Sequence, residues 1–256
     1  MFSSFYLMCP THRKETLYTI RRRLENGENC RVVSTQVMEA GIDVDFPLGY
    51  RAMAGLDSII QAAGRINREG KRESGEIHVF EPDTPFIKKM PIFVQQGVAV
   101  SESILRHYSD DPVSIKAITA YFRMLYTLHD ERSFDAKEII PCFEKGLGEL
   151  NFDFKTAAER FNLIDSNTVP VIVPYNEEAK QLIGELKNTP YPATTLRKLQ
   201  MYTVNIYEYE FESLQSKGVI ETYHEKYEVL NNQNFYDEQT GLILPADDGG
   251  QAFFFN

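Results

Sequence analysis

Cysteine is scarce in this sequence. The 256 residues contain only three, Cys9, Cys30 and Cys142, and they lie far apart. An odd number of scattered thiols fits a reducing compartment and offers neither a disulfide framework nor a zinc site. The five histidines show no metal-ligand spacing such as HExxH. We therefore expect no bound metal and no disulfide.

Long apolar runs are absent as well. No run approaches the roughly 20 residues that a helix needs to cross a bilayer. The opening MFSSFYLMCP lacks the basic region and the long apolar core of a signal peptide. Apolar residues make up 43% and charged residues 25% of the chain, the balance of a globular protein with one large or two small domains. These features predict a cytoplasmic protein without a membrane partner.

Positive charge is in short supply, but it is unevenly placed. The net charge is −10, which argues against a protein that simply coats nucleic acid. Residues 1–75 hold 11 Lys and Arg against 9 Asp and Glu, or +2, so the remainder holds 16 against 28, or −12. A local basic surface in the first third can still bind phosphate.

The first 81 residues alternate short apolar runs with helical patterns. Helices are expected from Thr11 as N-cap through residue 25 and again over 56–67. Strands are expected at 5–8, 31–35, 42–46 and 75–80. This alternation predicts an α/β layer with a mainly parallel sheet.

The pattern changes at Pro82. A helical region runs to about His129, and the rest mixes helices with short strands. Helices are expected at 155–164 and 176–187, strands at 169–175 and 202–211, and a hairpin at 227–244. The predicted division is therefore 1–81, a helical linker at 82–129, and an α+β domain at 130–256.

The stretch QAAGRINREG carries polar residues at helical spacing. On a helical wheel Gln61, Arg65 and Arg68 lie opposite the apolar face that contains Ile59. A solvated face alone would explain this column. Gly64 in a helix interior costs about 1 kcal/mol relative to alanine, which favours a close approach to the backbone. Arginine also suits bidentate binding of a phosphate.

A second pattern is STQVMEAGIDVDF. The hydroxyls of Ser34 and Thr35 end an apolar strand, where a strand's carboxyl end meets a ligand crevice. Gly41 permits a sharp turn, and Asp43 and Asp45 alternate with apolar residues. Taken alone, this pattern would be better explained by an N-cap hydroxyl, a turn glycine and two solvent-side aspartates.

Together and in this order, the two patterns resemble motifs V and VI of superfamily 2 helicases. CPTHRKETL, STQVMEAGIDVDF, YRAMAGLDSIIQAAGRINREG and GEIHVFEP closely resemble the CRISPR-associated helicase-nuclease family of type I systems. YTVNIYEYEF and YEVLNNQNFYDEQTGL resemble its subtype I-C branch most. The resemblance is specific over 8–82 and diffuse over 83–256. It implies a partial second RecA-like lobe, a helical linker and a small α+β C-terminal domain.

The resemblance also assigns nucleotide-side roles. Gln61, Arg65 and Arg68 match motif VI, which faces the ATP bound on the first RecA-like lobe. Arg68 matches the arginine finger and Arg65 a second contact to the γ-phosphate. Gly41 and Asp43 match the nucleotide-side end of motif V.

On the DNA side, Ser34, Thr35 and Gln36 match the part of motif V that touches the backbone of single-stranded DNA. Arg13 is a further candidate for such a contact, and an ordinary surface arginine is an equal alternative. The resemblance implies single-stranded DNA and the type I CRISPR surveillance complex as partners.

The chain also departs from the family. It has no GxxxxGK[ST] phosphate loop, no DEAD- or DEAH-type motif and no HD motif. ATP and Mg²⁺ serve the family protein, so we expect this chain to bind neither alone and to need the N-terminal HD nuclease and first RecA-like lobe as partners. Two alternatives remain: a non-catalytic module or truncated partner of the surveillance complex, and a lobe of another superfamily 2 translocase.

Overall fold

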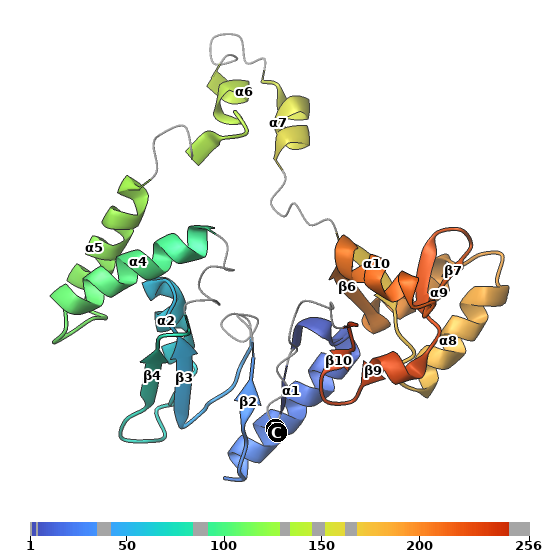
Figure 1. The fold of residues 1–256 in the computed structure, drawn as a ribbon, viewed down its shortest axis with the longest axis horizontal. Helices are drawn as coiled ribbons and strands as arrows, with labels where there is room; N and C mark the ends of the chain where they lie inside the picture. Colours follow the sequence, from blue (N-terminus) through green and yellow to red (C-terminus); the bar gives the residue numbers. More distant parts are fainter. Residues whose placement is uncertain are drawn as a thin grey trace. The chain divides into compact units, whose positions relative to one another are not determined.

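The computed structural model describes most residues of the chain. They are 2–3, 5–34, 42–83, 92–128, 134–144, 152–161 and 168–245. The contacts form two compact units (Figure 1). The first joins Met1–Met38 to Ser166–Asn256, and the second is Glu39–Asp165.

This grouping differs from the predicted division at residues 81 and 129, because the N-terminal helix packs with the C-terminal residues. The predicted mixture of helices with parallel strands is confirmed. Within the described part of 1–81, however, the parallel strands form two separate pairs. These pairs are β1 (Phe2–Ser3) with β2 (Val32–Val33) and β3 (Leu48–Ala52) with β4 (Glu76–Phe80).

The first unit is built on a four-stranded sheet with the order β6-β5-β8-β7. Its strands are β5 (Thr168–Ile172), β6 (Thr203–Tyr207), β7 (Ile220–Tyr223) and β8 (Tyr227–Leu230). β5 runs antiparallel to β6 and parallel to β8. Its helices include α8 (Glu177–Asn188), α9 (Ala193–Leu199) and α10 (Glu208–Ser216).

Two helix starts show how local sequence sets this unit. The Asn176 side chain accepts the Ala179 N–H at 2.9 Å and caps α8, which lies close to the helix expected over 176–187. The strand expected over 202–211 instead ends at Tyr207. There the Glu210 carboxylate accepts the Tyr207 N–H at 2.8 Å, so a new helix begins.

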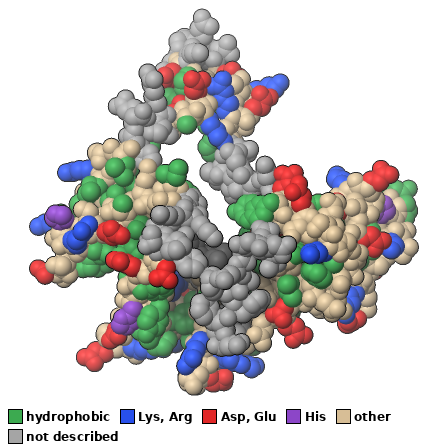
Figure 2. All heavy atoms as spheres, in the orientation of Figure 1, with side chains coloured by type: hydrophobic (Ala, Val, Ile, Leu, Met, Phe, Trp, Pro, Cys, Tyr) green, Lys and Arg blue, Asp and Glu red, His purple; other side chains and the backbone are tan. Residues whose placement is uncertain are grey.

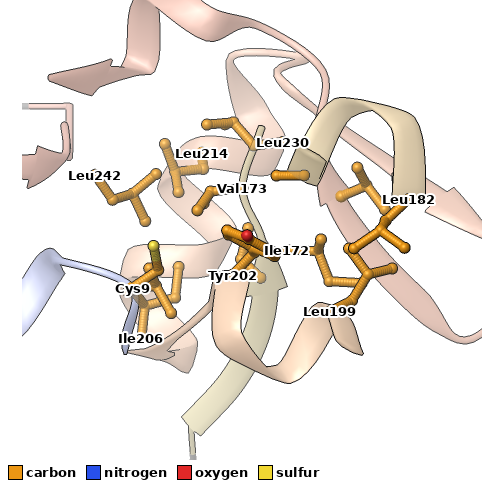
Figure 3. Close-up of a cluster of buried hydrophobic side chains, with 14 of the residues drawn as sticks. Cys9, Ile172, Val173, Leu182, Leu199, Tyr202, Ile206, Leu214, Leu230 and Leu242 are labelled. Carbon is orange, nitrogen blue, oxygen red and sulfur yellow. The ribbon is translucent and has the colours of Figure 1, made fainter. Parts of the chain in front are cut away.

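The core of the first unit gathers side chains from both ends of the chain (Figure 3). Strand and helix residues such as Ile206, Leu214 and Leu230 are at most 2% exposed. Cys9, from the N-terminal segment, is fully buried in the same cluster. This shared core accounts for the packing of the N-terminal helix with the C-terminal residues.

The N-terminal helix α1 (Pro10–Glu25) begins with Pro10 at its first position and Cys9 as N-cap, rather than with Thr11 as N-cap. The residues just before it, expected as a strand at 5–8, form the short 3₁₀ helix η1 (Phe5–Leu7). The turn glycine Gly241 lies against this segment with φ +85°. A side chain at this glycine would collide with the Leu7 carbonyl.

His12 is the polar link between α1 and the C-terminal hairpin of β9 (Tyr236–Asp237) and β10 (Gly241–Leu242). It is 1% exposed, and its ring lies 4.7 Å from the Tyr175 ring. Nε2 lies 2.9 Å from the Glu238 carbonyl and Nδ1 lies 2.9 Å from the Tyr236 hydroxyl. Because a carbonyl only accepts, Nε2 carries the hydrogen and Nδ1 accepts from Tyr236.

The second unit contains a β-α-β element. α2 (Leu56–Ala63) connects the parallel strands β3 and β4. The strand expected over 42–46 is wrong: Phe46 makes only an isolated bridge to Ile66, and the strand lies at β3. Further helices are α4 (Ile92–His107), α5 (Ile115–Thr127), α6 (Ile140–Glu144) and α7 (Phe154–Arg160).

The start of α2 is fixed by α4 and α5. Tyr121 of α5 is 1% exposed and donates its hydroxyl to Asp57 at 2.9 Å. A Cβ at Gly55 would lie 2.6 Å from that hydroxyl oxygen, and one at Gly97 would lie 3.3 Å from the Gly55 Cα. The two glycines therefore let the three helices approach closely.

We expect the first unit to lose stability in mild acid through His12. Burial lowers the pKa of this imidazole below its ordinary value, so the unfolded chain binds the proton more tightly. The free energy of unfolding therefore falls as the pH drops from about 6.5 toward the folded-state pKa. Urea denaturation between about pH 7.5 and 5 should show this slope. His12→Gln should reduce it and the exposed His107→Gln should not. Equal slopes in wild type and His12→Gln would contradict the assignment.

Candidate functional site

The helix that carries the candidate arginines is shorter than the sequence pattern predicts. α2 ends at Ala63, and Gly64 is its C-cap with φ −64°. Gln61 lies in the last turn of the helix, whereas Arg65 and Arg68 follow the helix in a loop. The predicted helical column is therefore wrong. A Cβ at Gly64 would meet the Gln61 carbonyl oxygen at 3.4 Å, an ordinary contact, so the close approach expected there is absent from the described residues.

The apolar face of α2 is confirmed. Leu56 is 1% and Ile59 is 6% exposed, whereas Gln61 on the opposite side is exposed. Ile60 packs against the cluster formed with α4 and α5. The buried face therefore fixes α2 and delivers the loop after it.

Ile66 anchors this loop on the parallel strands. A Cβ at Gly49 would lie 2.7 Å from Ile66 Cδ1, and one at Gly75 would lie 2.8 Å from Ile66 Cγ2. Phe46 donates its N–H to the Arg65 carbonyl at 3.0 Å. The Phe46 carbonyl accepts the Asn67 N–H at 2.8 Å. The loop is thus pinned on both sides of Ile66.

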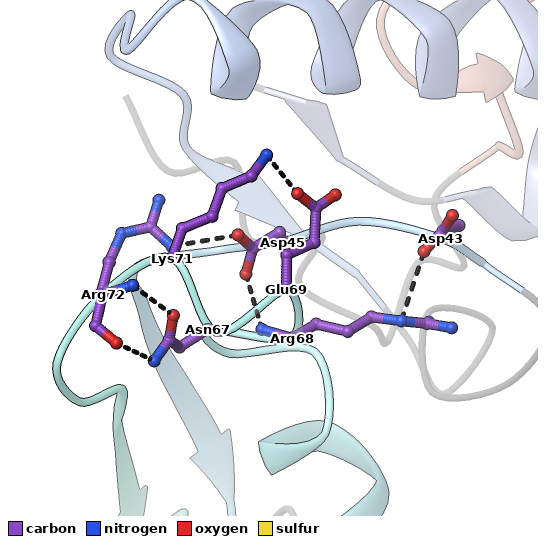
Figure 4. A network of polar contacts seen from close by, with 7 residues as sticks. All are labelled: Asp43, Asp45, Asn67, Arg68, Glu69, Lys71 and Arg72. Carbon is purple, nitrogen blue, oxygen red and sulfur yellow. Dashed lines mark hydrogen bonds and ion pairs between the residues drawn. The ribbon is translucent and has the colours of Figure 1, made fainter.

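Asn67 then reverses the chain. Its φ is +48°, a left-handed conformation that asparagine tolerates better than most residues. Its side chain accepts the Arg72 N–H at 2.9 Å and donates to the Arg72 carbonyl at 2.8 Å (Figure 4). These paired bonds close the loop between the two residues.

The Asp45 carboxylate also holds this loop, through contacts with Arg68 and Arg72. One carboxylate oxygen accepts the Arg68 N–H at 2.7 Å, and the other lies 3.2 Å from Arg72 Nη1 (Figure 4). The Asp45 side chain is 12% exposed. The alternative explanation of a solvent-side aspartate is therefore wrong for Asp45. This carboxylate instead fixes the Arg68 backbone.

The Arg68 side chain reaches the preceding motif. Its Nε lies 3.3 Å from the Asp43 carboxylate, and Nη1 donates to the Ile42 carbonyl at 3.3 Å. The Arg68 and Asp43 side chains are 40% and 72% exposed. Two of the predicted nucleotide-side residues are thus in contact. The remaining ion pair in Figure 4 joins Glu69 to Lys71.

The DNA-side residues belong to the first unit or lie outside the described residues. Ser34 is exposed and directly follows β2, the short strand found within the predicted strand 31–35. Thr35 and Gln36 lie outside the described residues, and so does Gly41 of the nucleotide-side group. Arg13 is half-buried on α1. It donates from Nη2 to the Met8 carbonyl at 3.2 Å, while its buried Nε has no hydrogen-bond partner among the described residues.

The residues that sequence reasoning missed are Asn67 and Arg72, together with the bridging role of Asp45. An asparagine five residues before an arginine gives no recognisable pattern, because the pairing depends on the left-handed turn. Across the described part of the chain, no three His, Cys, Asp or Glu side chains gather as a metal site. Nor does any described helix combine the length and apolarity needed to span a bilayer.

The arrangement presents an arginine side chain on an anchored loop. Arg68 has a fixed backbone and a partly exposed guanidinium that faces a carboxylate, so a phosphate could replace that carboxylate as its anion. The sequence contains no phosphate loop.

Sequence comparisons match the part of the chain that contains this site. Residues 3–71 match the family model described as "CRISPR-associated nuclease/helicase Cas3, C-terminal". The CRISPR-associated nuclease/helicase Cas3 of Haloferax volcanii is 46% identical over 57 residues, which is 20% of this chain and 6% of that protein. The same protein of Methanothermobacter thermautotrophicus is 32% identical over 98 residues, 38% of this chain and 12% of the relative.

Solved structures agree on the fold. T. fusca Cas3-ATP superposes with a TM-score of 0.53 at 14% identity, covering 90% of this chain and 32% of that one. T. fusca Cas3-ADP gives 0.52 at 15% identity, with the same coverage. At this identity the likeness establishes the fold alone. The chain spans about a third of the length of these structures.

We expect Asp45→Ala to destabilise the second unit by about 1–3 kcal/mol, because it removes a largely buried carboxylate that accepts the Arg68 N–H and pairs with the Arg72 guanidinium. Asp43→Ala is the matched control. It removes one exposed ion pair and should cost no more than about 1 kcal/mol. Urea denaturation of both variants measures the difference. Equal losses would show that Asp45 does not hold the loop.

Proposed function

We propose that this chain, which is related to the C-terminal region of the CRISPR-associated nuclease/helicases Cas3, supplies half of an ATP-driven motor. In this proposal it contributes the second RecA-like lobe of a single-stranded-DNA translocase that acts in CRISPR interference. The observation that carries the proposal is the contact of Arg68 with Asp43 on a loop that Asp45 fixes.

Arg68 acts as the arginine finger. Negative charge spreads over the transferred phosphoryl group during hydrolysis, and a guanidinium held beside it stabilises that charge. The backbone bond to Asp45 fixes the base of the Arg68 side chain, so little reorganisation is needed at the tip. Arg65 provides the second γ-phosphate contact in this proposal, and Gln61 lines the same side.

The partner of Arg68 changes when the lobes close. In the structure its guanidinium is shared between the Asp43 carboxylate and the Ile42 carbonyl. A γ-phosphate delivered by the first lobe competes for the same guanidinium. Asp43, together with Gly41, then forms the nucleotide-side end of motif V. Hydrolysis depends on closure because the finger and the phosphate lie on different lobes.

ATP with Mg²⁺ supplies the γ-phosphoryl group and the metal that neutralises its charge. Their binding residues belong to a lobe with a phosphate loop, which this sequence lacks. This chain's own residues orient the triphosphate and stabilise charge. Alone, the chain neither hydrolyses ATP nor cuts DNA in this proposal.

The DNA side uses Ser34, Thr35 and Gln36. The described member, Ser34, is exposed at the carboxyl end of a parallel strand, where a hydroxyl can contact a phosphodiester. Arg13 is a weaker candidate, because its guanidinium already donates to the Met8 carbonyl. The proposed protein partner is the type I surveillance complex, and subtype I-C is the preferred system.

Replacing the finger should abolish ATP hydrolysis in a protein that joins this chain to a Walker A-bearing first lobe. We expect Arg68→Ala to lower DNA-stimulated kcat by about 10³-fold or more. Arg68→Lys should rescue only part of this loss, because lysine lacks the planar fork. Phosphate release measures the rate.

Arg106→Ala, an exposed arginine of α4, is the matched control and should leave the rate unchanged. The chain without the first lobe should show only background turnover. A normal rate in Arg68→Ala would contradict the finger assignment. If the joined protein binds DNA and never hydrolyses ATP, the rival view of a non-catalytic module would be favoured.

A further inference from the structure

Three tyrosine rings of the first unit stack in a row. The candidate nucleotide-side residues belong to the second unit. The Tyr6 and Tyr207 ring centroids are 6.1 Å apart with planes at 30°. The Tyr207 and Tyr209 centroids are 5.7 Å apart with planes at 9°. We call Tyr6, Tyr207 and Tyr209 the tyrosine ladder.

The ladder is held at the Tyr6 end and exposed to solvent at the Tyr209 end. Glu210 accepts the Tyr207 N–H at 2.8 Å and the Tyr6 hydroxyl at 3.4 Å through the same oxygen. Burial and the nearby Glu210 charge raise the pKa of the Tyr6 hydroxyl, which keeps it a donor. Tyr207 is 46% and Tyr209 is 63% exposed. A rigid aromatic surface thus faces solvent.

The residues around the ladder carry charge of one sign. Between Lys198 and Lys217 the sequence contains no lysine or arginine, whereas Glu208, Glu210 and Glu212 lie within it. Glu208 and Glu212 are exposed and one helical turn apart on α10. Figure 2 shows red acidic side chains beside a green group, the colour that includes tyrosine, where this unit carries α10.

From these contacts we propose that the tyrosine ladder is a docking surface for an arginine-bearing segment of a partner protein. An arginine guanidinium is planar, stacks on an aromatic face and pairs with carboxylates through its fork. The exposed face of Tyr209 offers the stacking surface, and Glu208 and Glu212 offer the carboxylates. The inference does not depend on the proposed motor function.

The charge pattern selects this occupant over single-stranded nucleic acid. Bases also stack on tyrosine, but nucleic-acid sites combine stacking with a positively charged groove that tracks the phosphates. Here the two exposed carboxylates beside the ladder would repel a phosphate backbone. A lysine side chain pairs with carboxylates but lacks the flat face, so arginine is preferred.

The test is fluorescence anisotropy with the whole chain and a labelled peptide of alternating glycine and arginine. The same peptide with lysine, the same peptide with citrulline, and oligo-dT are the comparison probes. We expect tightest binding of the arginine peptide. Tyr209→Leu should weaken it by about two- to five-fold, the range of an exposed cation–π contact. Tyr209→Phe, which keeps the ring, should bind like wild type.

Matched variants separate the ladder from general attraction to an acidic protein. Tyr191→Leu removes a tyrosine of the same unit that is 84% exposed and should not weaken binding. Glu208→Gln with Glu212→Gln should weaken it more than Glu185→Gln with Glu225→Gln, which changes the net charge equally. Equal effects within either pair, no preference for arginine over lysine, or tighter binding of oligo-dT through Tyr209 would each overturn the proposal.

Discussion

The carboxylate of Asp45 is the constraint on which the candidate site depends. It accepts the Arg68 N–H and pairs with Arg72, and its side chain is only 12% exposed. Asn67 closes the same loop through its two bonds to Arg72. An unsupported loop arginine would sample many positions, and ordering it would oppose any contact with phosphate. Here these bonds hold the Arg68 backbone, so the proposed phosphate contact would need little further ordering.

This arrangement connects the two motifs by direct contact. Asp43 and Arg68 are 25 positions apart in the sequence, and their side chains lie 3.3 Å apart. The pair is exposed enough to be weak by itself, so a phosphate can displace the carboxylate without a large loss. A buried pair would resist such an exchange. A fixed base and an exchangeable tip together are consistent with the proposed role of Arg68, which requires its guanidinium to bind and release a phosphate.

Much of the fold follows from local sequence, and the exceptions have physical causes. The apolar face of α2, the cap at Asn176 and the strand β4 could be predicted from periodicity and residue type. The end of α2 could not, because Gly64 continues a helical pattern in sequence while the chain leaves the helix there. The bond from His12 to Tyr236 spans 224 positions, and local patterns carry no information about such a pairing.

The site shows the same limit. The resemblance to motifs V and VI singled out Asp43 and Arg68, and the structure brings these two side chains together. The supporting residues Asn67 and Arg72 became visible only through the left-handed turn at Asn67. Residue types indicated the chemistry, whereas the geometry that directs it came from tertiary contacts.

The most direct measurement is a structure of this chain joined to a nucleotide-binding first lobe, with a non-hydrolysable ATP analogue and single-stranded DNA bound. The account predicts that the Arg68 guanidinium leaves Asp43 and lies within hydrogen-bonding distance of a γ-phosphate oxygen, with the Asp45 bond to its backbone intact. A closed complex in which Arg68 remains on Asp43 while another arginine contacts the γ-phosphate would contradict it.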